Sequence, residues 1–187
     1  LIIFGAAWMI AIMQEKGKIR NIHSLLISIS PDARIQGIII AWLFGALIEG
    51  IAGFGTPAAL AAPLLVSLGF NPILSIVISL IANSTPVSFG AAGTPILFGL
   101  GKLGFDSVLL KEVYLKTAFL HFVSSIIVPI AIAYFIVSFY CKDNKRKRIL
   151  EIIPFAILSW LSFTIPYLLT AIFIGPELPS VIGGLVG

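Results

Sequence analysis

Charged residues are scarce in this chain. Lysine, arginine, aspartate and glutamate make up 11% of the 187 residues, whereas hydrophobic residues make up 59%. A soluble domain carries roughly 25% charged residues, because its surface has to be hydrated. The low charge therefore excludes a water-soluble globule and favours a protein whose solvent is lipid.

Cysteine and the signatures of enzymes are also missing. Cys141 is the only cysteine, so no disulfide can form within the chain. The sequence contains no HExxH motif, no P-loop and no cluster of metal-ligating residues, and Gly53-Phe54-Gly55 lacks the spacing of a nucleotide-binding loop. The expectation is a protein that is not an enzyme and that uses no metal or cofactor.

Long apolar runs are abundant instead. Two of them, about 117–140 and 152–173, reach the ~20 residues that a bilayer requires, and they predict spanning helices. The run 1–13 is interpreted as the end of a spanning helix, and 179–187 as the start of a further one. The chain is therefore expected to be a single transmembrane domain, 1–187, cut from a longer protein.

The apolar sequence between 35 and 101 is repeatedly interrupted by glycine and proline. A helix over 57–68 would be about 18 Å long at ~1.5 Å per residue, too short to cross ~30 Å of hydrocarbon. Breaks of this kind have to be buried in protein or line a watery cavity. The pattern predicts a re-entrant hairpin over 35–68 and one discontinuous helix over 72–101, with three separate crossings as the alternative.

Lysine and arginine are unevenly distributed between the loops. The basic run 141–148 follows an apolar run directly, which favours a cytoplasmic anchor over a nucleic-acid patch. An odd number of crossings between 35 and 101 places the loops 14–34 and 141–148 together in the cytoplasm. They then hold nine Lys and Arg, against three in the external loop 102–116. Ser30, followed by Pro31, is the predicted cap of the helix that leaves the first loop.

Three Thr-Pro pairs stand at the interruptions: Thr56-Pro57, Thr85-Pro86 and Thr94-Pro95. Threonine can cap a helix, and proline suits its first turn, so each pair predicts the start of a half-helix that favours an anion. The alternative is that glycine and proline only kink packed helices, and that the polar side chains bond neighbouring helices. The candidate substrate-binding residues are Gly53, Gly55, Thr56, Asn83, Ser84, Thr85, Ser88, Gly93 and Thr94.

Glu49 is the only charged residue within the apolar stretches of the centre. A lone carboxyl inside a membrane is costly and therefore marks a functional hypothesis, here that Glu49 carries a proton. The structural alternative is a glutamate that accepts hydrogen bonds from the unwound backbone between Gly53 and Thr56. His121, near the outer end of the helix 117–140, is interpreted as a packed or interfacial histidine rather than a proton relay.

Two long motifs resemble the L-lactate permease family. They are EGIAGFGTPAALAAPLLVSLGF from Glu49 to Phe70 and NSTPVSFGAAGTPI from Asn83 to Ile96. The flanking segments SISPDARIQ (28–36) and FIGPELP (173–179) also match. The resemblance covers nearly the whole chain, and most weakly 102–172.

The resemblance implies a multi-pass plasma-membrane transporter that takes up lactate and related 2-hydroxy monocarboxylates, such as glycolate, by proton symport. The family is similar to a wider group of ion transporters, in which paired inverted repeats each supply a helical hairpin and a broken helix to a central site. The chain then corresponds to most of the first half. The other half of the permease is an expected partner, beside the substrate, protons and membrane lipid, but no nucleic acid.

These predictions combine into an all-α, polytopic membrane protein. The carboxylate of lactate would meet the half-helix starts, its hydroxyl would bond to Asn83 or Ser88, and Glu49 would take the proton. Three alternatives stay open: a sodium-coupled transporter of another organic anion, an intramembrane enzyme or assembly subunit, and a truncated permease fragment without activity of its own.

Overall fold

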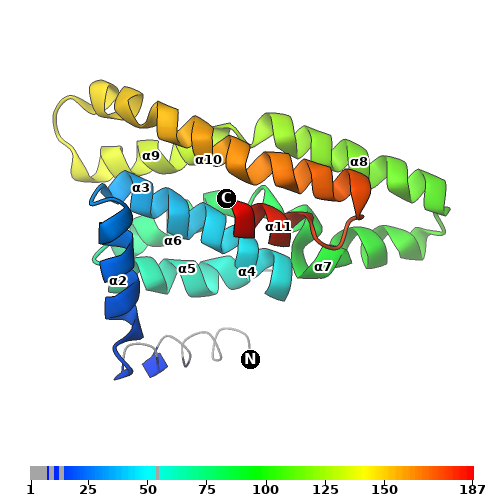
Figure 1. The fold of residues 1–187 in the computed structure, drawn as a ribbon, viewed down its shortest axis with the longest axis horizontal. Coiled ribbons are helices and arrows are strands. Elements are labelled where there is room, and N and C mark those ends of the chain that lie inside the picture. The colour runs from blue at the N-terminus through cyan, green and yellow to red at the C-terminus, as the bar shows by residue number, and fades with distance from the viewer. Residues whose placement is uncertain (1–7, 9–10, 13–14, 54) are drawn as a thin grey trace.

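The computed structural model describes residues 8, 11–12, 15–53 and 55–187. Every regular element in these ranges is a helix, which confirms the predicted all-α class. Most helices lie side by side along the long axis of the molecule, whereas α2 (Lys18–Ile29) stands across one end (Figure 1). The run 1–13, predicted to end a spanning helix, lies largely outside the described residues.

A helical hairpin occupies the segment predicted as re-entrant. Its first arm is one helix, Ala33–Ala52, composed of α3 (Ala33–Gly37), the π-helical η1 (Ile38–Phe44) and α4 (Gly45–Ala52). The chain then turns and returns as α5 (Thr56–Ser67). The first arm has 20 residues and is a candidate span, but α5 has only 12. The re-entrant path of 35–68 therefore stays a prediction.

The discontinuous helix is present as a bent pair. Its first part, α6 (Pro72–Ala82), is capped by Asn71, whose side chain accepts a hydrogen bond from the Ile73 amide at 2.9 Å. The second part runs through η2 (Pro86–Phe89), α7 (Gly90–Thr94), η3 (Pro95–Leu100) and η4 (Gly101–Leu103). The two parts meet at an angle of 61°, as in a broken span or a re-entrant loop.

The two longest helical paths follow this pair. One, Ser107–Tyr140, joins α8 (Ser107–Ser124) to α9 (Ile127–Tyr140), and the other is α10 (Lys145–Phe173). Both begin before the apolar runs 117–140 and 152–173, because each helix includes polar residues ahead of its apolar part. Asp106 caps α8 by accepting a hydrogen bond from the Leu109 amide at 2.7 Å.

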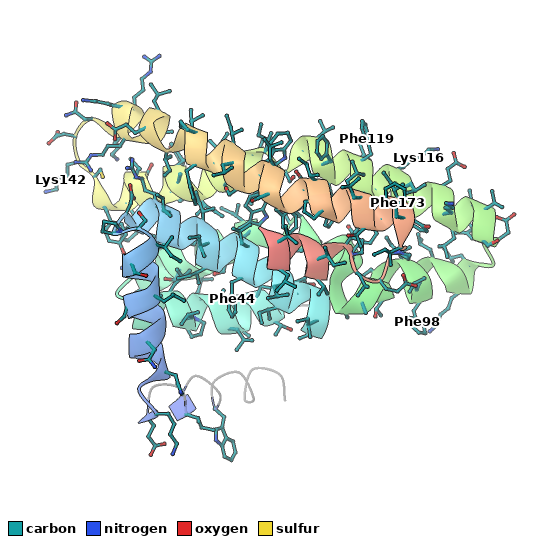
Figure 2. All side chains as sticks on the ribbon, in the orientation of Figure 1. Phe44, Phe98, Lys116, Phe119, Lys142 and Phe173 are labelled. Carbon is teal, nitrogen blue, oxygen red and sulfur yellow. The ribbon has the colours of Figure 1, made fainter. Side chains whose placement is uncertain are left out.

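The described residues thus contain three candidate spans, or four if the bent pair counts as one. Their outer faces are apolar: the exposed fractions of Phe98 and Phe119 are 62% and 58%. Figure 2 shows both side chains pointing away from the body of the molecule. A surface of this kind is unfavourable in water and suits lipid or another part of a membrane protein.

The two basic loops meet at one end of the molecule. The Arg34 side chain donates a hydrogen bond to the main-chain carbonyl of Arg148 and pairs with the Asp32 carboxylate. That hydrogen-bonded guanidinium holds the pKa of the Asp32 carboxyl below its ordinary value. Lys142 lies at the same end in Figure 2, far from Lys116. The parity argument required this arrangement of 14–34 and 141–148, whereas their cytoplasmic placement stays a prediction.

The last helix, α11 (Pro179–Val186), packs tightly against the hairpin. A Cβ atom on Gly50 of α4 would lie only 2.6 Å from the amide nitrogen of Val181. The two helices can approach this closely because the contact residues include glycines on both sides, a pattern that suits helix packing in membranes. This contact holds α11 beside the interrupted helices (Figure 1).

Candidate functional site

The two interruptions of the helices lie against each other. We call Gly53 and Gly55, at the turn of the hairpin, the first break, and 83–94, within the bent pair, the second break. A Cβ atom on Gly53 would lie 2.7 Å from the Cβ atom of Ala91, so the turn rests on the second break. Gly53, Thr56 and Thr85 are buried at this junction.

The backbone of the second break adopts a left-handed conformation over three consecutive residues. The φ angles of Ala91, Ala92 and Gly93 are 44°, 52° and 75°. Alanine is unfavourable there, and such strain persists only where the surrounding structure imposes it, often at functional sites. Gly93 packs against the loop before α11, where a Cβ atom would lie 3.1 Å from the Cα of Glu177.

Glu49 is enclosed between the two breaks. It lies on α4, one turn before the first break, and its exposed fraction is 0%. A Cβ atom on Gly90 would lie 2.5 Å from its Oε1 atom, so the absence of a side chain at Gly90 makes room for the carboxyl. Neither carboxyl oxygen has a hydrogen-bond partner within the described part of the chain.

The structural alternative for Glu49 is therefore not supported by the described residues. The amide of Gly53 donates to the main-chain carbonyl of Glu49 at 2.9 Å, and the amide of Thr56 donates to the carbonyl of Gly53 at 3.2 Å. Both amides thus donate to main-chain carbonyls, and neither donates to the carboxyl group of Glu49.

The Thr-Pro pairs do begin helical segments, but threonine does not cap them as predicted. α5 begins at Thr56, and η2 and η3 begin directly after Thr85 and Thr94. The Thr56 hydroxyl donates to the Gly53 carbonyl at 2.6 Å, the Thr94 hydroxyl donates to the Ala91 carbonyl, and no side chain caps η2. The capping prediction is wrong because the backbone of Thr85 and Thr94 is helical rather than extended, and because Gly55, not Thr56, is the N-cap residue of α5.

The remaining candidate residues divide by exposure. Asn83 and Ser88 are half-buried, and the Oδ1 atom of Asn83 has no partner among the described residues. Ser84 is exposed, and its hydroxyl donates to the Ile81 carbonyl at 2.8 Å. Gly55 is exposed with open space beside it. The structure therefore gathers only part of the predicted set at the junction.

Two residues outside the predicted set hold the second break from distant helices. Tyr167 of α10 donates a hydrogen bond to the Thr85 carbonyl at 3.4 Å, and Ser180 of α11 donates to the Pro86 carbonyl at 2.8 Å. Two successive carbonyls of an interrupted helix are thereby satisfied, as a membrane interior requires. The sequence signal for these residues is weak, because a single hydroxyl within an apolar helix is common.

The chemical groups at the junction are few. In the described ranges, no group of three or more His, Cys, Asp or Glu could hold a metal ion. The junction offers left-handed backbone, hydroxyl groups and one enclosed carboxyl. Interrupted helices that meet beside a polar site, in a chain with several candidate spans, are typical of membrane transport proteins.

Comparison with known proteins places the chain within this class. Residues 1–187 match the family described as L-lactate permease, and the chain belongs to this family. No solved structure matches it.

Several named relatives are permeases. The chain is 38% identical to the L-lactate permease of Bacillus subtilis (strain 168) over 186 residues, which cover 99% of the chain and 31% of the relative. It is 38% identical to the L-lactate permease of Escherichia coli (strain K12) over 185 residues, 99% of the chain and 32% of the relative. It is 37% identical to a glycolate permease of the same strain, over 99% of the chain and 31% of the relative. The chain thus spans about a third of the length of the curated relatives it matches.

Proposed function

We propose that the chain forms part of the permeation site of a secondary transporter that takes up L-lactate and related 2-hydroxy monocarboxylates across the plasma membrane by proton symport. The observation that supports this most directly is the placement of Glu49. Its carboxyl is fully buried between the two breaks and has no partner among the described residues. Family membership, and relatives named for lactate and glycolate, support the substrate class.

Glu49 has the chemistry of a proton carrier that works together with the substrate. A carboxyl in a membrane interior is stable without a counter-charge when it holds a proton. An entering carboxylate and a proton on Glu49 together add no net charge to the junction, whereas the carboxylate beside an ionised Glu49 would be repelled. The proton and the anion are therefore expected to enter and leave as a pair.

The substrate anion is proposed to bind where the helices restart. The first turn of α5 has Gly55 as its N-cap residue, and this glycine offers no side chain that could compete with a ligand. The start of a helix has partial positive charge, which favours a carboxylate. The predicted binding residues around it remain part of the proposal: Gly53, Gly55, Thr56, Asn83, Ser84, Thr85, Ser88, Gly93 and Thr94.

The test uses the protein as its gene encodes it, purified and reconstituted in proteoliposomes. Uptake of labelled L-lactate is measured with an inward proton gradient, with and without a protonophore, and in parallel with an inward sodium gradient at constant pH. Uptake that requires the proton gradient and collapses with protonophore is the expected result. Uptake that follows sodium alone would replace this proposal by the sodium-coupled alternative.

Glu49→Gln separates the proton from the binding site, because glutamine keeps the shape of the side chain but cannot release a proton at physiological pH. We expect gradient-driven net uptake to fall at least about 100-fold, an effect of the size typical for loss of a proton-transfer group. Exchange of labelled for unlabelled lactate should survive. Net uptake at the wild-type rate in Glu49→Gln would remove Glu49 from the mechanism.

A further inference from the structure

A hydrogen-bonded chain of side chains reaches the second break from two long helices. The Nδ1 atom of His121, on α8, lies 2.9 Å from the hydroxyl of Tyr167, on α10. The Nε2 atom of the same ring lies 3.4 Å from the hydroxyl of Ser88, in η2. The histidine therefore connects a tyrosine that binds the break with a serine that belongs to it.

The tyrosine at the far end of this chain is firmly held. Tyr167 is fully buried, and its ring packs edge-on against Phe89 with a centroid distance of 5.3 Å. It also contacts Phe163 at 5.3 Å and lies nearly parallel to the His121 ring. Because aromatic packing fixes the ring, the position of its hydroxyl is fixed as well.

The positions of the protons in the hydrogen bonds between Thr85, Tyr167, His121 and Ser88 follow from counting donors. The carbonyl of Thr85 can only accept a hydrogen bond, so the hydroxyl of Tyr167 donates its single proton to that carbonyl. The tyrosine oxygen must then accept from Nδ1–H of His121. In a neutral imidazole the other nitrogen, Nε2, is left as an acceptor. The hydroxyl of Ser88 therefore donates to Nε2.

The neutral ring is the form to expect at this place. The hydrogen-bond partners found for His121 among the described residues are all uncharged: the hydroxyl groups of Tyr167 and Ser88, and the main chain of Thr85. An isolated charge within a membrane protein is costly unless an opposite charge accompanies it. Tyr167 thus donates to the Thr85 carbonyl, His121 donates to Tyr167, and Ser88 donates to His121. We call this series of donors the proton order.

This order decides what Ser88 can offer to a ligand. Its only proton points to the histidine, so it presents lone pairs on its remaining side. Lone pairs accept a hydrogen bond from a substrate hydroxyl, but they repel a carboxylate, which has no proton to give. Ser88 is half-buried, so one side of it is accessible for such a contact.

We propose that Ser88, oriented by His121 and Tyr167, sets the preference of the transporter for 2-hydroxy acids by accepting the hydrogen bond of the substrate hydroxyl. This inference rests on the proposed function. It assigns the substrate hydroxyl to Ser88 rather than to Asn83. Ser88 contacts the substrate, whereas His121 and Tyr167 are positioning residues that act through it.

The experiment compares L-lactate with propionate, which lacks only the hydroxyl group. kcat and KM for uptake of both labelled acids are measured in proteoliposomes of the protein as its gene encodes it. In Ser88→Ala we expect KM for lactate to rise about three- to tenfold, the effect of one lost neutral hydrogen bond, with KM for propionate unchanged. Ser88→Thr keeps a hydroxyl and should keep the preference.

Two variants test the role of the histidine. His121→Asn retains a polar group near the position of Nδ1 but loses the partner of Ser88, and it should reduce the lactate preference as Ser88→Ala does. The double variant, with Ser88→Ala and His121→Asn together, should lower the lactate preference no further than either single variant does, because the two residues act through one hydrogen bond. Tyr167→Phe keeps the ring and removes the proton order, and it should also reduce the preference. Tyr134→Phe, on the exposed face of α9, is the matched control.

The outcomes separate this inference from the proposed function. If the wild type takes up lactate and Ser88→Ala keeps the ratio of lactate to propionate, the assignment of Ser88 is wrong and the transport function stands. If the wild type takes up neither acid, both proposals fail. If Ser88→Ala loses all uptake, the ratio of the two dissociation constants, measured by equilibrium binding to the purified variant, decides in the same way.

Discussion

At the scale of single residues, the junction depends on Gly90 as much as on Glu49. The glycine lies where the enclosed carboxyl needs space, and a Cβ atom there would come within 2.5 Å of Oε1 and 3.2 Å of Cδ. Real Cβ atoms do not approach other heavy atoms so closely, so one of the two groups has to move. The glycine thus leaves the space that the carboxyl of Glu49 occupies.

Gly90→Ala should therefore lower both stability and transport. We expect the free energy of unfolding to fall by about 1–3 kcal/mol, the usual effect of overpacking, and gradient-driven uptake to fall with it. Thermal unfolding of the purified protein in detergent and uptake in proteoliposomes measure the two effects. Gly99→Ala is the control, because no atom lies within 4 Å of the new Cβ position. Equal behaviour of the two variants would contradict the proposed geometry.

At the scale of elements, the second break contains a short left-handed segment, Ala91 to Gly93, in which two of the three residues are alanine. Ala92 has a φ angle of 52° and is exposed, so its side chain contributes strain without burying apolar surface. Glycine adopts this conformation freely, whereas an L-amino acid with a side chain loses roughly 1 kcal/mol there. The break is thus more rigid, and less stable, than a glycine segment would be.

Ala92→Gly should for this reason stabilise the protein, by about 1 kcal/mol. Ala59→Gly, within the right-handed helix α5, is the matched control and should destabilise it by about 0.5–1 kcal/mol. The difference between the two variants is measured by denaturant unfolding in mixed micelles. A loss of stability in Ala92→Gly similar to that in Ala59→Gly would show that the left-handed conformation is not imposed on the chain.

Local sequence signals located several elements and misplaced others. Asn71, followed by Pro72, caps α6 at the position where the sequence predicts a helix start. The helix after the first loop is capped by Asp32, not Ser30, whose hydroxyl accepts the amide of Asp32 at 3.1 Å. Serine and aspartate both cap helices well, so the sequence alone does not show which of Ser30 and Asp32 is the cap. The long helices were predicted too short, because polar first turns continue a helix beyond its apolar part.

The candidate site shows the same division. Glycine, proline and a lone glutamate are local features, and they located both breaks and Glu49 from the sequence. The contacts of Tyr167 with Thr85, and of Ser180 with Pro86, join residues 82 and 94 positions apart. Contacts of this range depend on how the helices pack, and no periodicity or cap signal specifies them. The same holds for the placement of His121 beside Ser88.

At the scale of the whole molecule, the chain has two distinct ends. The basic loops around Arg34 and Arg148 meet at one end of the molecule. The turn between α5 and α6 lies at the same end, since the amide of Asn71 in this turn donates a hydrogen bond to the Tyr140 hydroxyl at 2.8 Å. The loop before α8 lies at the other end (Figure 1). A molecule with its positive charge gathered at one end has a defined orientation in a membrane.

This orientation can be measured with cysteine labelling, because Cys141 is the only cysteine. Cys141→Ser, with any cysteine of the protein outside these 187 residues also replaced by serine, gives a background without thiols. Lys18→Cys, Lys142→Cys or Phe105→Cys is then introduced singly. In intact cells, a membrane-impermeant maleimide should label only position 105, and permeabilisation should expose positions 18 and 142.

The three positions test separate parts of the argument. Labelling of 18 and 142 from outside, with 105 protected, would mean that the arrangement is right and the orientation is inverted. If 18 and 142 were accessible from opposite sides, the number of crossings between them would be odd in total, and the hairpin over 35–68 and the bent pair could not both have the proposed paths. Protection of 18 and 142 together with labelling of 105 would leave one crossing, or three, between 35 and 101. The single hairpin is then favoured, because α5, with 12 residues, is about 18 Å long and cannot cross the bilayer alone.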